Sequence, residues 1–155
     1  MEIEKVKEIV RRKPLFFLFI SLGYLVLVAL LKWNIHPTWN TLLFLAGGVL
    51  GVYFLDIAEV FFELTPSPFR SIVFVGAFMV VSLFIVTSSG SPLASGLVLS
   101  LYLTLLFWQV GQWQIQKNLN DWYRMVAGPV HAGAQRWILV GFVVLLFVET
   151  FLFVR

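Results

Sequence analysis

Long apolar runs dominate the chain, and polar residues gather in short stretches between them. A helix that crosses a bilayer needs about 20 predominantly apolar residues, and we find five runs of roughly that length. The pattern predicts an all-α, polytopic transmembrane bundle with spans at about 15–32, 40–63, 69–87, 93–113 and 137–154. Residues 14–155 then form one transmembrane domain, and residues 1–13 precede it.

The first thirteen residues carry their own pattern. Ile3, Val6, Ile9 and Val10 recur at roughly helical spacing with Lys and Glu between them, which predicts a short amphipathic helix. A solvated charged tail is the alternative. The apolar run that follows is longer than the core of a signal peptide and precedes no A-x-A-like cleavage site, so we expect a retained first span.

Turn residues mark the ends of the other spans. Ser67 with Pro68, and Ser91 with Pro92, are typical of an N-cap followed by a first helical residue, so they predict the starts of the third and fourth spans. Residues 114–127 show apolar positions at i, i+3, i+4 and i+7. We therefore expect a helix there that continues the fourth span, rests on the membrane interface and ends at Gly128-Pro129.

Composition supports the membrane assignment. The chain is 60% hydrophobic and only 12% charged, and its mean hydropathy is +0.93. A water-soluble domain carries about twice that share of charge. The net charge of +3 does not indicate a nucleic-acid partner, because the basic residues lie at the ends of apolar runs. Membrane lipid is the partner that the pattern predicts.

The basic residues also predict orientation. With the N-terminus in the cytoplasm, nine Lys and Arg residues fall in cytoplasmic segments and two in outer segments, as the positive-inside rule requires. The expected location is the plasma (inner) membrane. The nine are Lys5, Lys7, Arg11, Arg12, Lys13, Arg70, Lys117, Arg124 and Arg136, and the two are Lys32 and Arg155.

The second span holds the most informative polar residues. Asp56, Glu59 and Glu63 stand at i, i+3 and i+7, so they share one helix face. Gly47 and Gly51 lie on nearly the opposite face, in the small-residue pattern that lets helix backbones approach closely. This span is therefore expected to have a packing face and an acidic face.

The fourth span repeats that division. Gly96, Ser100, Thr104 and Gly111 form a small-residue face, and Gln109, Gln112 and Gln116 repeat the spacing of the acids. Both spans run from outside to inside in this topology, so their polar residues lie at similar depth. A contact between the glutamines and the carboxylates is therefore geometrically possible.

Asp56 needs a physical reason to lie in a span, because an Asp at the centre of a membrane helix costs about 2.5–3.5 kcal/mol. Protonation, a water-filled cavity, a bound cation or a basic group of another chain would relieve that cost. Arg70 is expected to reach Glu63 near the surface, and not Asp56. Glu149 stands alone in the fifth span and is a secondary candidate. It either snorkels or is hydrogen-bonded locally, or it acts with Asp56.

The sequence does not identify a cofactor or a metal. His36 and His131 fall on opposite sides of the predicted membrane, so they do not ligate one metal together, and Cys is absent. Among hydrolase and nucleotide-binding motifs, the chain has no P-loop, no G-x-S-x-G and no H-E-x-x-H. These observations favour a membrane protein without catalytic activity over an enzyme acting on lipid.

Two functions remain open. In the first, Asp56, Glu59, Gln109 and Gln112 line a polar cleft that handles protons or small cations, within an oligomer because one such chain is small for a transporter. In the second, the protein is an assembly or regulatory subunit, and the acidic face that includes Glu63 docks on a larger membrane complex. Asp56 is the central residue of both hypotheses.

Overall fold

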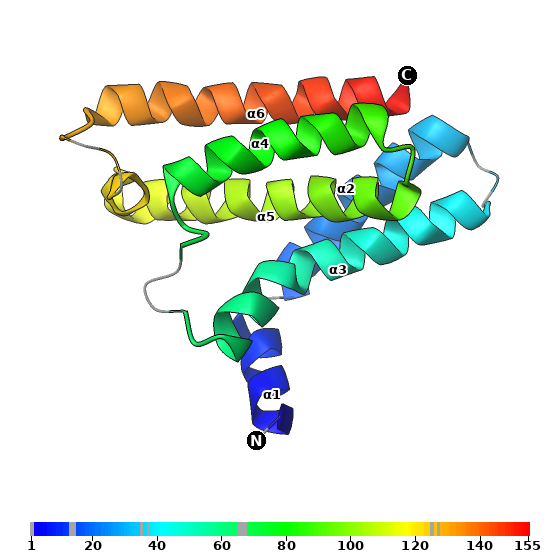
Figure 1. Cartoon of the computed structure of the whole chain (residues 1–155), viewed down its shortest axis with the longest axis horizontal. Helices are drawn as coiled ribbons and strands as arrows, with labels where there is room; N and C mark the ends of the chain where they lie inside the picture. Colours follow the sequence, from blue (N-terminus) through cyan, green and yellow to red (C-terminus); the bar gives the residue numbers. More distant parts are fainter. Residues whose placement is uncertain are drawn as a thin grey trace.

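The computed structural model describes residues 2–12, 15–34, 36, 38–64, 68–124, 126 and 128–155. These residues form helices and connecting segments without a β-strand. Figure 1 shows the arrangement, in which one short helix, α1, projects from the end of a bundle. The helices are α1 (Glu2–Arg12), α2 (Leu15–Trp33), α3 (Trp39–Phe61), α4 (Ile72–Ser88), α5 (Pro92–Gln116), the 3₁₀ helix η1 (Asn120–Tyr123) and α6 (Ala132–Val154).

Four helices, α2, α3, α5 and α6, are long and apolar enough to cross a membrane. The expected third span corresponds to α4, which has only 17 residues. At 1.5 Å per residue it is about 26 Å long, slightly less than the hydrocarbon core of a typical bilayer. The N-terminal amphipathic pattern forms α1, whose Ile9 is buried while Ile3 stays exposed.

The helix starts follow the hydroxyl residues, with one correction. The Ser91 hydroxyl accepts a hydrogen bond from the Ala94 N–H, and Pro92 is the first residue of α5, as predicted. Pro68 is not helical, so the expected start of the third span is wrong. The cap is instead Ser71, whose hydroxyl accepts from the Phe74 N–H at 3.2 Å. Ser67, the cap that we expected, lies outside the described residues.

Glycines bring α3 and α5 into close contact, as the small-residue pattern predicts. A Cβ on Gly47 would overlap the carbonyl oxygen of Leu93, and a Cβ on Gly96 would overlap that of Phe44. The Ser100 hydroxyl donates to the Gly48 carbonyl at 2.6 Å. Gly47 lies against Leu93 and Gly51 against Leu97, so the two helices run in the same direction, and α4 returns the chain from the end of α3 to the start of α5 (Figure 1).

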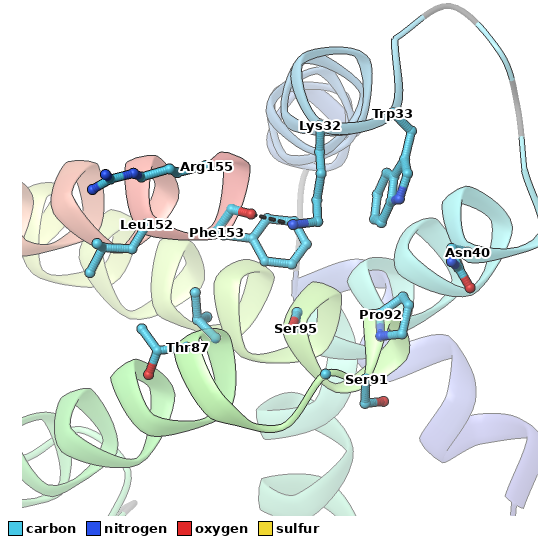
Figure 2. A pocket seen from close by; sticks show the side chains of 12 residues that line it. Lys32, Trp33, Asn40, Thr87, Ser91, Pro92, Ser95, Leu152, Phe153 and Arg155 are labelled. Atoms are coloured by element: carbon cyan, nitrogen blue, oxygen red, sulfur yellow. Dashed lines mark hydrogen bonds between the residues drawn. The ribbon is translucent and has the colours of Figure 1, made fainter.

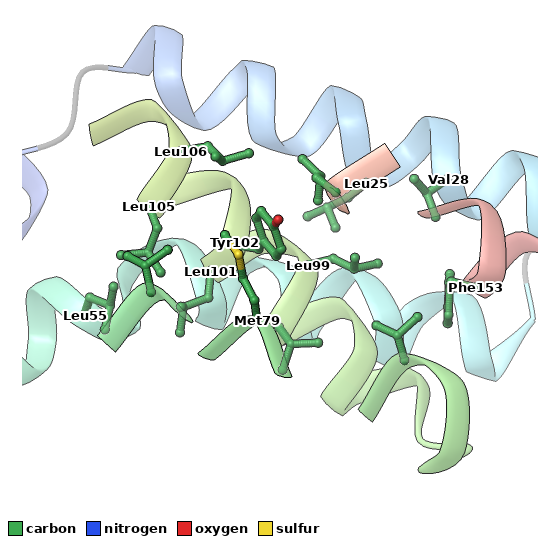
Figure 3. Close-up of a cluster of buried hydrophobic side chains, with 14 of the residues drawn as sticks. Leu25, Val28, Leu55, Met79, Leu99, Leu101, Tyr102, Leu105, Leu106 and Phe153 are labelled. Carbon is green, nitrogen blue, oxygen red and sulfur yellow. The ribbon is translucent and has the colours of Figure 1, made fainter. Parts of the chain in front are cut away.

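The apolar core surrounds α5. Figure 3 shows side chains from α2, α3, α4 and α6 converging on its middle turns. Gly111, which we had placed on the packing face, is an exception, since a Cβ there would meet nothing within 4 Å. The buried side chains of this core include Leu25, Val28, Leu55, Met79, Leu99, Leu101, Tyr102, Leu105, Leu106 and Phe153.

The expected interfacial helix over 114–127 is wrong. α5 ends at Gln116, and Lys117 takes a left-handed conformation with φ of 58°. The chain then turns back and forms η1, which packs against α4. Leu119 and Trp122 are buried within the protein, whereas an interfacial helix would expose its apolar face.

Two glutamines explain why the chain turns back at this point. The Trp122 indole donates to Gln112 Oε1 at 2.7 Å, and the Leu119 N–H donates to Gln135 Oε1 at 2.8 Å. The Gln135 amide also donates to Asn120 Oδ1 and to the Val130 carbonyl. These bonds from α5 and α6 satisfy polar groups of the η1 segment. Helical periodicity in the sequence does not reveal such bonds between elements.

Candidate functional site

The acidic face of α3 is only partly formed. Asp56 and Glu59 are buried, at 1% and 5% exposure. Glu63 lies beyond the helix end, where it is exposed and has a left-handed φ of 51°. The Leu64 N–H donates to the Glu59 carbonyl and the Phe62 N–H to that of Ala58, the pattern of a left-handed C-terminal cap. Glu63 therefore does not join the other two acids.

Glu59 has its counter-charge within the chain. Arg70 Nε lies 3.4 Å from Glu59 Oε1, and the Arg70 guanidinium lies over the ring of Trp108, 4.2 Å from its centroid. The expectation that Arg70 pairs with Glu63 is therefore wrong. The early end of α3 explains this, because it turns Glu63 away from the face that Arg70 approaches. The Glu59–Arg70 pair links the end of α3 to α5.

Asp56 also interacts with a neighbour within the protein. The expectation that something outside the chain relieves the charge of Asp56 stays a prediction. Asp56 and Glu59 are one turn apart and face inward. Both acids therefore lie inside the bundle near the C-terminal end of α3.

The glutamines of α5 do not face these acids. Ser100 points toward α3, because its hydroxyl bonds Gly48. Gln109 is nine residues further on, a rotation of about 900°, so it points to the opposite side of the helix. Gln112 is engaged with η1 through Trp122 and, at 3.3 Å, through Asp121. The contact that we considered between Gln109 and the acids of α3 is therefore not favoured.

Glu149, the secondary candidate, occupies the most enclosed polar position. It is fully buried on α6, and both of its carboxylate oxygens lie within hydrogen-bond distance of the Ser82 hydroxyl, at 2.8 and 3.0 Å. Ser82 comes from α4 and is also fully buried. Within the described part of the chain, no basic side chain bonds this carboxylate. Glu149 thus has the property that the sequence analysis assigned to Asp56.

Two tyrosines complete the surroundings of Glu149. The Tyr24 hydroxyl lies 2.5 Å from Thr150 Oγ1, and the Tyr102 hydroxyl donates to the Phe142 carbonyl at 2.5 Å. Both phenols are near enough to interact electrostatically with the carboxylate. We name Glu149, Ser82, Tyr24, Tyr102 and Thr150 the Glu149 cluster, to which α2, α4, α5 and α6 all contribute.

Sequence reasoning missed the partners of Glu149, although a signal was present. Ser82, Tyr24 and Tyr102 each place a hydroxyl inside an apolar helix. A polar group at such depth needs a hydrogen-bond partner in the protein, because lipid offers none. Isolated hydroxyls in several spans, read together with a single acid, would have indicated a shared polar site.

A pocket of about 380 Å³ opens near this cluster, at the end of the bundle that holds Lys32 and Arg155. Figure 2 shows Lys32 reaching inward to the Phe153 carbonyl, to which its Nζ donates at 2.5 Å, while the Arg155 side chain points away. We name it the Lys32 pocket. Its lining includes Val86 and Phe153, which follow Ser82 and Glu149 by four residues each. One helical turn therefore separates the pocket from the Glu149 cluster.

The described residues contain no group of three or more His, Asp or Glu side chains that could hold a metal ion. His131 caps α6, since its Nδ1 accepts from the Gly133 N–H at 3.0 Å. No protein-family model, curated protein or solved structure matches the chain. One carboxylate among hydroxyl groups is a set of ligands that suits a proton, which needs only one acceptor.

Proposed function

We propose that this protein is a non-enzymatic membrane protein that binds and releases protons at Glu149 within the bilayer. The observation that supports it is the complete burial of a carboxylate whose described hydrogen bonds come from a serine hydroxyl. Intramembrane acids are costly and usually serve ion or proton movement. A carboxylate that gains a proton loses its charge. Glu149 can therefore alternate between an ionised and a protonated form in the same site.

The Ser82 hydroxyl is suited to both states. When Glu149 is ionised, Ser82 donates its proton to the carboxylate, at the 2.8 Å distance observed. When Glu149 is protonated, the hydroxyl can accept from the carboxyl group and donate to the Met79 carbonyl, which lies 3.1 Å away. A serine is both donor and acceptor, so the switch needs no movement of the helices.

The surroundings favour a proton over a metal cation. Hard cations such as Ca²⁺ take six to eight oxygen ligands, and Mg²⁺ takes six. The Glu149 cluster supplies one carboxylate with hydroxyl and phenol groups. Lys32 and Arg155 line the neighbouring pocket. A divalent cation there meets about twice the repulsion that a proton meets, because the energy scales with the charge of the ion.

The proposed topology keeps the N-terminus in the cytoplasm of a plasma (inner) membrane. The excess of basic residues in the segments on that side supports it. The only two basic residues of the opposite side, Lys32 and Arg155, line the same pocket. The parallel course of α3 and α5 supports α4 as a fifth crossing, since the chain must return between them. The Lys32 pocket then faces outward.

A role as an assembly subunit that docks through its acidic face is less well supported. Such docking requires the acids to face outward, and Asp56 and Glu59 are buried within the chain. The large apolar side chains that are exposed, such as Phe16, Phe84 and Phe147, suit contact with membrane lipid. Homo-oligomer formation through these surfaces is compatible with proton binding at Glu149.

Infrared spectroscopy of the protein in lipid nanodiscs tests this function, because protonated and ionised carboxyl groups absorb differently. We expect one pH-dependent carboxyl band to disappear in Glu149→Gln, seen in the difference from the unmodified chain because the other seven acids contribute to both spectra. The amide keeps the size and hydrogen-bonding capacity of the side chain, so folding should be retained. Glu63→Gln, at an exposed site, is the matched control and should keep the signal. A signal unchanged in Glu149→Gln would contradict the proposal.

A further inference from the structure

Polar residues repeat along one side of α5 at intervals of seven. Ser95, Tyr102, Gln109 and Gln116 form this row. Seven residues rotate a helix by about 700°, which is within 20° of two full turns, and they rise about 10.5 Å. The row therefore extends over about 31 Å, close to the thickness of the hydrocarbon core. Its first three members are buried in the bundle.

The outer part of the row reaches the Glu149 cluster. Ser95 lines the Lys32 pocket, and Tyr102 belongs to the cluster itself through its bond to α6. The outer half of the row therefore runs from the Lys32 pocket to the cluster that holds the buried carboxylate. The proposed function uses only this half of the row.

The inner part contains polar groups with unmet hydrogen-bonding capacity. Gln109 is fully buried, and neither its Nε2 nor its Oε1 has a hydrogen-bond partner within the described structure. The hydroxyl of Tyr123, in η1, is in the same condition. Buried amides and hydroxyls are almost always hydrogen-bonded, and ordered water is the usual partner when protein groups are absent.

The packing of α5 on α6 places Gln109 beside η1. The two helices are antiparallel, and the Tyr102 hydroxyl meets the Phe142 carbonyl. Seven residues from Tyr102 lead to Gln109, and seven back from Phe142 lead to Gln135. Gln109 therefore lies at about the level of Gln135, whose amide binds the Leu119 N–H at the start of the η1 segment.

We infer that Gln109 and Tyr123 hold ordered water that connects Glu149 with the η1 end of the bundle. This inference rests on the proposed function and extends it, because a carboxylate reached from both ends carries protons across the membrane. A proton from water in the Lys32 pocket bonds to a Glu149 oxygen. It then passes to water at Gln109, and a proton leaves that water chain at the η1 end, which restores the carboxylate.

The groups around this path fit such a role. Tyr24 of α2 and Tyr102 of α5 lie close enough to Glu149 to interact with it electrostatically. Ser82 of α4 donates to it, and the basic groups Lys32 and Arg155 line the pocket. At the inner end, burial raises the pKa of Tyr123, so its phenol remains a neutral donor to water. Asp121 and Arg124 are exposed and form a salt bridge with each other, with Arg124 Nη2 lying 3.2 Å from Asp121 Oδ1.

Proton flux into liposomes under a pH gradient tests the inference with variants of the full chain. Gln109→Met keeps the side-chain volume and removes the amide, and Tyr123→Phe removes one oxygen. We expect Gln109→Met to lower the flux about tenfold, the effect of losing roughly one hydrogen bond's free energy from the path. Tyr123→Phe should lower it severalfold. Gln114→Met, at an exposed position of the same helix, is the matched control and should conduct as the unmodified chain does.

The titration of Glu149 separates this inference from the proposed function. We expect the carboxyl signal of Glu149 in nanodiscs to persist in Gln109→Met, because the outer pocket still admits protons. Normal flux in both Gln109→Met and Tyr123→Phe would overturn the inner path and leave proton binding at Glu149 in place. Loss of any titration at Glu149 in the unmodified chain would instead overturn the proposed function.

Discussion

Replacement of Glu149 by leucine separates a functional carboxylate from a structural one. Unfolding in detergent returns the carboxylate to water, so the folded state bears the cost of burying it. On the membrane-insertion scale an acid at a helix centre costs about 2.5–3.5 kcal/mol, and leucine contributes about 0.3–0.6 kcal/mol favourably. The exchange therefore gains about 3–4 kcal/mol before hydrogen bonds are considered.

The bond from Ser82 offsets part of this gain. A hydrogen bond to a charged group contributes about 1.5–3 kcal/mol, and Ser82 itself keeps a partner in the Met79 carbonyl at 3.1 Å. The net expectation for Glu149→Leu is a stabilisation of about 1 kcal/mol together with complete loss of proton binding. For a chain of this length, thermal unfolding should shift upward by about 2–4 °C.

Gln135→Leu is the matched control, since Gln135 lies on the same face of α6 and is equally buried. Its amide accepts from Leu119 and donates to Asn120 and Val130. Loss of these bonds leaves a buried backbone N–H of the η1 segment without its acceptor, so we expect a destabilisation of about 1–3 kcal/mol. If thermal unfolding in detergent showed Glu149→Leu destabilised as strongly as Gln135→Leu, Glu149 would be a structural residue.

Two further substitutions test the packing and the helix end. Gly96→Ala should destabilise the bundle by about 1–3 kcal/mol, because its Cβ would overlap the Phe44 carbonyl. Gly76→Ala, at a position where a Cβ meets nothing within 4 Å, should instead stabilise the bundle by about 0.8–1 kcal/mol. Equal melting temperatures of the two variants would contradict the close approach of α3 and α5. Glu63→Gly should raise the unfolding temperature, because glycine removes the steric cost of the left-handed backbone at φ of 51°, a gain of about 1 kcal/mol. A lowered unfolding temperature would contradict the cap geometry.

The helices and their close contacts could be predicted from the sequence, because both depend on local patterns. The apolar runs predicted the long helices of the bundle, and Gly47 and Gly51 indicated the face of α3 that packs on α5. Ser91 with Pro92 marked a helix start. α4 proved shorter than expected, because Ser71 caps it.

The partners of the polar residues could not be predicted in the same way. Helical periodicity fixes which residues share a face, but not which neighbour that face meets. A contact between the acids of α3 and Gln109 of α5 was therefore possible from the sequence. In the structure, Gln109 points to the side of α5 opposite to α3. Likewise, the pattern in residues 114–127 indicated a surface helix, whereas bonds from Gln112 and Gln135 turn that segment back.

The buried acids of this chain differ in a way that separates structure from function. Glu59 is paired with Arg70 and lies where α3 ends, so its charge strengthens a contact that holds the fold. Glu149 accepts a hydrogen bond from a hydroxyl and not from a cation, and it lies one helical turn from a pocket whose lining includes Lys32 and Arg155. A salt bridge would fix the ionised form, whereas a hydroxyl serves both protonation states. The absence of a basic partner at Glu149, within the described chain, is therefore the property that proton exchange requires.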